Sequence, residues 1–120
     1  MKFPLLAGIC LVSARTIDEV QCQKKNGDLT TMIHQFCNNR KIVVPGWYAE
    51  QGQWTPNSHS KIFIEGNCKP PQWIPPYWCK KQFFSMCARG GGHGGSKAKF
   101  GKDKCQKWEI YYDRHPGWHQ

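Results

Sequence analysis

The chain has 120 residues and a net charge of +9, from 17 basic and 8 acidic residues. This length suits one domain, and no apolar run approaches the ~20 residues that a membrane-spanning helix needs. We therefore expect a single domain without a transmembrane segment. A chain of this size buries only about two-thirds of its unfolded surface, so covalent cross-links matter for its stability.

Residues 1–14 have the order of parts of a secretion signal. One lysine precedes an apolar run, and small residues end the segment at Ala14. Cleavage after Ala14 would remove Cys10 and leave residues 15–120 as a single secreted domain. An even number of cysteines then remains, which predicts a disulfide framework: Cys22, Cys37, Cys68, Cys79, Cys87 and Cys105. Their pairing stays open, with helix-to-sheet bridges as the simplest arrangement.

The first half of this domain predicts a strand, a helix and two further strands. Residues 19–23 alternate in polarity and predict a strand, and residues 29–37 carry apolar side chains at helical spacing. The β-branched run at 41–44 and the alternating run at 61–65 predict a hairpin with a long connection. Residues 47–54 would form an irregular edge of that hairpin.

The second half predicts one helix and one strand, separated by loops. Residues 69–76 are rich in proline, which predicts a stiff extended linker, and residues 78–89 show a helical apolar face. Residues 90–96 are rich in glycine and predict a flexible loop, and residues 97–104 predict a basic loop. Residues 105–112 alternate and predict the last strand.

The predicted order is therefore β-α-β-β-α-β. We expect an α+β fold in which a four-stranded antiparallel sheet carries two helices on one face, held by disulfides. A β-sandwich is the alternative, but it leaves the helical spacing at 29–37 unexplained.

Basic residues are concentrated in the C-terminal half. The net charge is +1 over residues 15–65 and +7 over residues 66–120. Such a surface favours anionic partners, and basic residues beside aromatic ones suit both phosphate contact with stacking and anionic membranes. The candidate partner-binding residues are Lys80, Lys81, Arg89, Lys97, Lys99, Phe100, Lys102, Lys104 and Lys107.

Enzymatic chemistry is the less favoured interpretation. A small secreted ribonuclease needs an acid–base pair and a basic residue near the phosphate, and Glu65, Glu109, His59 and Arg89 supply those types. We expect no metal and no cofactor, because no Cys-x-x-Cys pair occurs and Pro-Gly interrupts the segment between His115 and His119.

The chain resembles the small secreted effectors of plant-pathogenic fungi. The shared features are the short signal, the six mature cysteines, the order of elements and the strand at 105–110. Within these effectors, the order is similar to that of the killer-toxin-like α/β-plait group. The resemblance covers residues 22–112. It implies a secreted virulence factor that binds a host or extracellular component without catalysis.

We therefore expect a secreted, monomeric, non-enzymatic effector or toxin-like protein whose basic half binds an acidic host protein or an anionic surface of lipid or polysaccharide. Nucleic acid is a less favoured partner. The alternatives are a membrane-active antimicrobial protein and a secreted ribonuclease. Extracellular action is expected, with translocation into a host cell as the alternative.

Overall fold

A computed structural model of the protein describes residues 15–114, so the predicted signal sequence and residues 115–120 lie outside the described part. In chain order its elements are helices α2 (Ile17–Lys25) and α3 (Gly27–Asn39), strand β1 (Ile42–Val44), helix α4 (Trp47–Gln51), strands β2 (Gln53–Trp54), β3 (Ser60–Gly66) and β4 (Gln72–Ile74), helix α5 (Pro76–Arg89), strand β5 (Ser96–Phe100), the 3-10 turn η1 (Lys102–Lys104) and strand β6 (Gln106–Tyr112).

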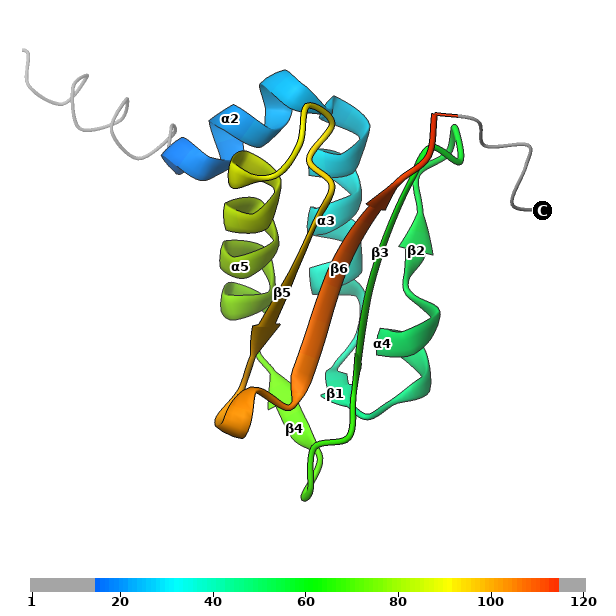
Figure 1. The fold of residues 1–120 in the computed structure, drawn as a ribbon, viewed down its shortest axis with the longest axis vertical. Coiled ribbons are helices and arrows are strands. Elements are labelled where there is room, and N and C mark those ends of the chain that lie inside the picture. Colours follow the sequence, from blue (N-terminus) through cyan, green and yellow to red (C-terminus); the bar gives the residue numbers. More distant parts are fainter. Residues whose placement is uncertain (1–14, 115–120) are drawn as a thin grey trace, which may run out of the picture.

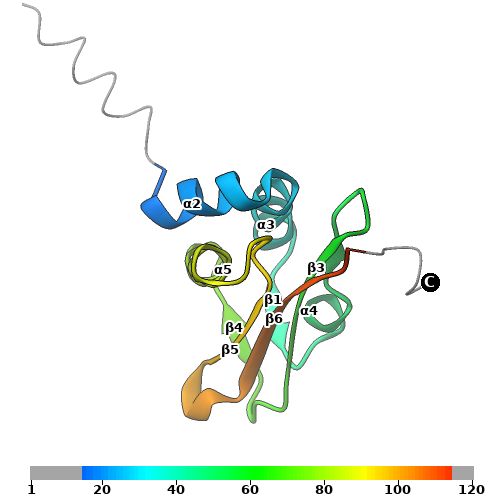
Figure 2. The ribbon, with the colours of Figure 1, turned by 45° about the horizontal axis from the view of Figure 1, so that its top comes forward.

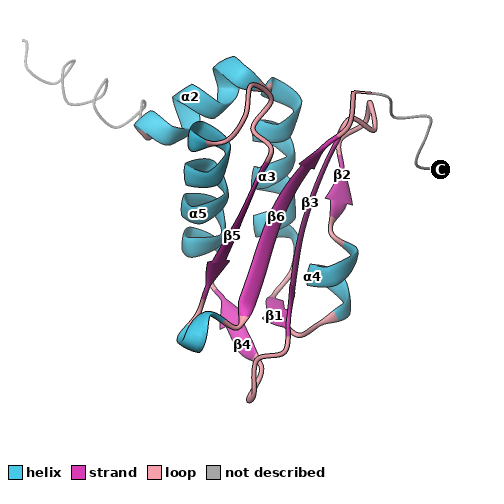
Figure 3. Ribbon diagram, viewed as in Figure 1, coloured by secondary structure: helices cyan, strands magenta, loops and turns pink. Residues whose placement is uncertain are grey.

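The main sheet is antiparallel, with four strands in the order β2-β3-β6-β5 (Figure 1). Helices α3 and α5 pack against one face of it, and α2 lies across these two helices (Figure 2). This confirms the predicted α+β class and the four-stranded antiparallel sheet. The predicted order β-α-β-β-α-β is not the observed one, because the chain begins with two helices and contains additional short elements (Figure 3).

The prediction of a strand at 19–23 is wrong, because these residues belong to α2. The Oγ1 atom of Thr16 accepts a hydrogen bond from the Glu19 amide at 3.1 Å and caps the helix. Acidic residues occupy the first turn and Lys24 and Lys25 the last, which suits the helix dipole. Only Cys22 of this helix is buried, so its sequence lacks the apolar stripe that marks a helix lying on a core.

The predicted hairpin between 41–44 and 61–65 does not form. Strand β1 pairs instead with β4, with Ile42 opposite Ile74, in a separate two-stranded sheet. Residues 69–76 are therefore not a plain linker, since β4 lies inside them. Strand β3 pairs with β2 on one side and with β6 on the other.

Two further segments differ from the prediction. The expected irregular edge at 47–54 forms helix α4 and strand β2, joined at Gly52, whose φ of +62° lies in the left-handed region. The expected basic loop at 97–104 contains most of strand β5, because Ala98 and Phe100 face the core while the alternating Lys97 and Lys99 face solvent.

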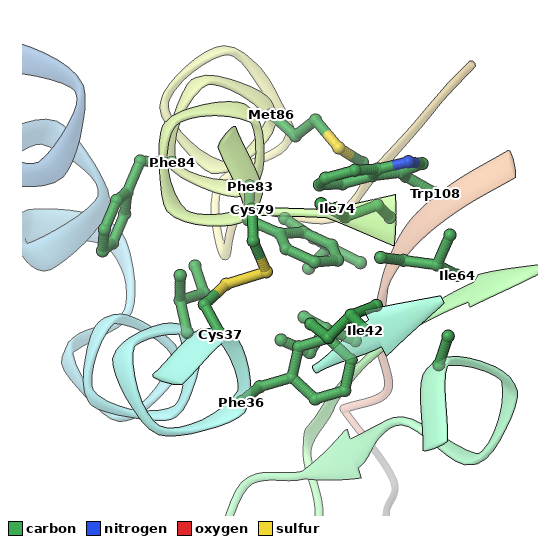
Figure 4. Packing of buried hydrophobic residues seen from close by; sticks show 14 of the residues in the cluster. Phe36, Cys37, Ile42, Ile64, Ile74, Cys79, Phe83, Phe84, Met86 and Trp108 are labelled. Carbon is green, nitrogen blue, oxygen red and sulfur yellow. A yellow bond between two sulfur atoms is a disulfide. The ribbon is translucent and has the colours of Figure 1, made fainter. Parts of the chain in front are cut away.

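The core fills the space between the sheet and the helices (Figure 4). Phe83 of α5 packs against Trp108 of β6 with ring centroids 4.6 Å apart, and Phe36 of α3 meets Phe83 at 6.1 Å. The apolar stripe predicted for residues 29–37 is buried on α3, as expected. The largest fully buried side chains are Trp108, Phe36, Phe83, Leu29, Met32, Ile33, Ile42, Ile62 and Ile64.

The six predicted cysteines form three disulfides, but not the helix-to-sheet bridges we expected. Cys22 of α2 pairs with Cys87 of α5, and Cys37 of α3 pairs with Cys79 of α5. Both bridges join helix to helix because α2 and α3 both pack against α5. The third bridge, Cys68–Cys105, joins the segments that follow β3 and precede β6.

Candidate functional site

The main sheet has one face that the helices do not cover. Successive side chains of a strand point to opposite faces, so every second residue of β3, β5 and β6 projects away from the core. Strand register sets Lys97 opposite Glu109 and Lys99 opposite Lys107 on this side. We call this surface the open face; its side chains are Trp54, Lys61, Phe63, Glu65, Lys97, Lys99, Lys107, Glu109 and Tyr111.

Aromatic side chains occupy one half of the open face. Trp54 and Tyr111 meet edge to face, with ring centroids 6.1 Å apart. The Nζ atom of Lys61 lies 4.8 Å from the ring centroid of Phe63 and 5.7 Å from that of Trp54. This half of the open face therefore offers ring surface and a cationic group together.

The other half of the open face is hollowed. A groove of about 340 Å³ crosses β3, β6 and β5 between charged side chains. Glu65 lies opposite Lys107, and Glu109 lies opposite Lys97, so two carboxylates stand among the lysines. In the described part of the chain, the open-face lysines form no ion pair, since the pairs that do form involve Asp18 and Glu19.

The basic surface continues around the end of the sheet. A groove of about 620 Å³ is lined by Lys69, Lys102, Lys104 and Lys107, with Asp103 among them. Lys107 also lines the groove of the open face, so the two hollows are neighbours. The structure therefore brings together five of the predicted partner-binding lysines, which are Lys97, Lys99, Lys102, Lys104 and Lys107.

The three basic residues predicted on the second helix do not join this surface. Arg89 donates to the Oδ2 atom of Asp18 at 3.2 Å, within the helical layer. Lys80 and Lys81 line a different groove, together with Asp18 and Glu19. Packing of α2 against α5 places acidic residues beside these bases, which partly neutralises them.

Phe100 is half-buried and points away from the neighbouring lysines. It lies on the inner side of β5, where its ring centroid is 5.0 Å from that of Trp108 and it packs against the core. The prediction grouped it with the neighbouring lysines because they are adjacent in sequence. In a strand, adjacent residues point to opposite faces.

The residue types considered for a ribonuclease are spread over the molecule. Glu65 and Glu109 share the groove of the open face. His59 lies at the far end of β3, four residues from Phe63, the register partner of Glu109. Four strand residues span about 13 Å, so Glu109 and His59 do not form a close pair. Arg89 lies in the helical layer.

The histidines of the described part do not converge on a common centre. His59 and His93 both pack against the ring of Tyr112, with centroids at 5.8 and 4.1 Å, while His34 contacts Glu19 at 2.9 Å. Within residues 15–114 no group of three or more His, Cys, Asp or Glu side chains could hold a metal ion. His115 and His119 lie outside the described residues.

Of the helices that the structure describes, none has the length and apolar character to span a membrane. Comparisons of the chain with protein families, curated proteins and solved structures found no match. The resemblance to the killer-toxin-like effectors stays a prediction.

Sequence reasoning missed the aromatic part of the open face. Trp54, Phe63 and Tyr111 come from three strands and meet only through strand pairing. The alternation in residues 61–65 and 107–111 was visible and could have shown that Phe63 and Tyr111 project on the polar side. Trp54 carried no such signal, because β2 has only two residues.

Proposed function

We propose that the protein is a secreted, non-enzymatic binding protein of the effector or toxin type, and that its open face binds an acidic partner. The observation that carries this proposal is a sheet face without helical cover, on which Lys61, Lys97, Lys99 and Lys107 have no ion-pair partner in the described residues. These four lysines outnumber the two carboxylates of the open face, Glu65 and Glu109, and a surface of net positive charge attracts a partner of the opposite sign and speeds association.

The composition of the open face favours a protein as that partner. Glu65 and Glu109 stand between the lysines, and these carboxylates would repel a continuous polyanion such as RNA or an acidic polysaccharide. A protein surface can offer basic and acidic groups in a matching pattern. Trp54, Phe63 and Tyr111 add aromatic contact area, and aromatic residues often dominate the binding energy at protein interfaces.

The three disulfides support the secreted part of the proposal. Such bonds persist in oxidising compartments and are rare in the cytosol. Here they join all three long helices and tie the segment after β3 to the start of β6. A small domain fastened in this way presents a rigid sheet surface, which lowers the entropy cost of binding.

A pair of variants with equal net charge tests the proposal. The first, Lys97→Gln/Lys99→Gln/Lys107→Gln, removes three charges from the open face. The control, Lys24→Gln/Lys80→Gln/Lys81→Gln, removes three charges from the helical layer. Immobilised proteins would be incubated with extracellular fluid of candidate host tissue, captured proteins identified by mass spectrometry, and the purified partner titrated at 50 and 300 mM NaCl.

We expect capture of an acidic protein, a dissociation constant raised at least about tenfold by the open-face variant, and a change below about twofold for the control. Higher salt should weaken binding. Equal loss in both variants would contradict the role of the open face. RNA cleavage that disappears in Glu109→Gln would replace the proposal with the ribonuclease alternative, and leakage of anionic but not neutral vesicles would favour the membrane-active one.

A further inference from the structure

A separate groove lies away from the open face, where the N-terminal half of α5 meets β4 and the turn between β5 and β6. In Figure 1 this region lies between the lower end of α5, strand β4 and the orange turn. The groove has a volume of about 480 Å³, which falls in the ~300–1,000 Å³ range of small-molecule sites. It is lined by two tryptophans, Trp73 and Trp78, and three glutamines, Gln72, Gln82 and Gln106.

The groove has no charged side chain in its lining. The chain carries 17 lysines and arginines, yet none of them lines this groove, and no Asp or Glu does either. The Lys41 Nζ atom lies 5.9 Å from the ring centroid of Trp73, and Gln72 also lines the lysine-bearing groove at the end of the sheet, so cationic groups border this groove without lining it. The lining therefore suits a neutral ligand.

Both tryptophan residues are half-exposed. The exposed fraction is 54% for Trp73 and 48% for Trp78. Exposed aromatic residues that line one groove together are more typical of a contact surface than residues scattered singly. An indole face packs well against a flat apolar surface, such as the C–H face of a pyranose ring.

The glutamine amides offer unused hydrogen-bonding groups. The Oε1 atom of Gln72 accepts from the Gln106 side chain at 2.9 Å and from the Lys102 backbone at 3.2 Å, which leaves the Gln72 N–H groups without a partner among the described residues. Gln82 makes no side-chain hydrogen bond within residues 15–114. None of these atoms is fully buried, so they reach solvent and a ligand.

The amides of Gln72 and Gln106 are held in place before any ligand binds. Trp108 donates its indole N–H to Gln106 at 2.9 Å, and Gln106 in turn donates to Gln72, so a chain of hydrogen bonds runs from the core to the groove. Gly101 has a φ of +85°, and a Cβ there would lie 2.5 Å from Gln72 Oε1 and 2.6 Å from Gln106 Nε2. Only glycine therefore lets the turn close over these amides.

We propose that this groove binds a neutral oligosaccharide built of pyranose units. Sugar hydroxyls donate and accept hydrogen bonds, as amides do, while the C–H faces of the rings stack on indoles. A proline-rich peptide is the competing ligand for an aromatic groove; its backbone carbonyls can accept from the Gln72 N–H groups, but it offers few donors to the Gln82 amide oxygen, whereas sugar hydroxyls serve both. The site is distinct from the open face, so the proposal does not depend on the proposed function.

The test is a titration followed by nuclear magnetic resonance of the indole N–H groups. Each tryptophan gives its own cross-peak, which variants assign. The probes are hexasaccharides of β-1,4-linked glucose, N-acetylglucosamine, xylose and mannose, an oligogalacturonate as an anionic probe, and a proline-rich peptide. We expect at least one neutral hexasaccharide to shift the peaks of Trp73 and Trp78 and to leave the peak of Trp47, which does not line the groove, nearly unmoved.

Single variants connect the shift to the groove. Trp78→Ala and Gln82→Ala should each weaken binding by about tenfold or more, because they remove a stacking surface and an amide from the site. Trp47→Ala is the matched control, since Trp47 is 69% exposed but does not line the groove, and it should leave affinity unchanged. Unfolding midpoints of all three variants show whether they remain folded.

Three results would overturn the proposal: no shift with any neutral hexasaccharide at 10 mM, equal weakening by Trp47→Ala, or tighter binding of the oligogalacturonate or the peptide than of every neutral probe. The open-face variant Lys97→Gln/Lys99→Gln/Lys107→Gln should bind the sugar as the wild type does. Loss of partner binding with intact sugar binding would therefore separate the two proposals.

Discussion

Lys25 connects two helices through a single ammonium group, and its removal should be costly. The Nζ atom donates to the backbone oxygens of Cys87 at 3.2 Å, Ala88 at 2.6 Å and Gly90 at 3.0 Å. Cys87 and Ala88 belong to the last turn of α5 and Gly90 follows it; the Cys87 oxygen also accepts from the Gly90 amide at 3.3 Å, and the other two carbonyls are among those that a helix end leaves open. Lys25 is the last residue of α2, so it places a cation at the negative end of the α5 dipole and satisfies all three of its own donors.

The magnitude follows from these contacts. A hydrogen bond to a charged group contributes about 1.5–3 kcal/mol, and a cation at a helix C-terminus about 0.3–1 kcal/mol. Water can reach the partly exposed carbonyls once the ammonium is gone, which recovers part of the loss. We expect Lys25→Met to lower the free energy of unfolding by about 2 kcal/mol, because Met retains most of the apolar stem but no donor.

Urea unfolding followed by circular dichroism measures this loss. The control is Lys24→Met, which changes net charge equally at an exposed position of the same helix. With a denaturant slope of about 1–3 kcal/mol per molar, the Lys25→Met midpoint should fall by roughly 0.7–2 M, and that of the control by less than about 0.3 M. Equal midpoints for the two variants would refute the stabilising role of Lys25.

Two further predictions use paired positions. Phe83→Ala should lower the free energy of unfolding by about 3–5 kcal/mol because it leaves a cavity beside Trp108, whereas Phe63→Ala on the open face should lower it by less than about 1 kcal/mol. Thermal unfolding of both variants measures this difference. Similar losses would contradict the assignment of one covered and one uncovered face to the sheet. Gly52→Ala should lower the free energy of unfolding by more than about 2 kcal/mol, because the added Cβ would meet a backbone oxygen. Gly92→Ala should leave it nearly unchanged, because the space around Gly92 is open. Equal urea midpoints for the two variants would contradict this prediction.

The elements that sequence reasoning found correctly have strong periodicity. Residues 29–37 and 78–89 show a helical apolar face, and residues 61–65 and 105–112 alternate, because each of these elements packs one side against the core. Helix α2 was missed for the opposite reason. It lies on other helices and buries only Cys22, so its capping residue Thr16 and its charge distribution were the available signals.

By itself, the sequence determined that this is an α+β domain with an even set of cysteines after residue 14 and a basic C-terminal half. Only the tertiary structure decided the cysteine pairing, the β1–β4 sheet, and the division of the basic residues between the open face and the helical layer. The physical reason is that periodicity records which side of an element is buried but not which distant element buries it. The grooves of this protein lie between such distant elements.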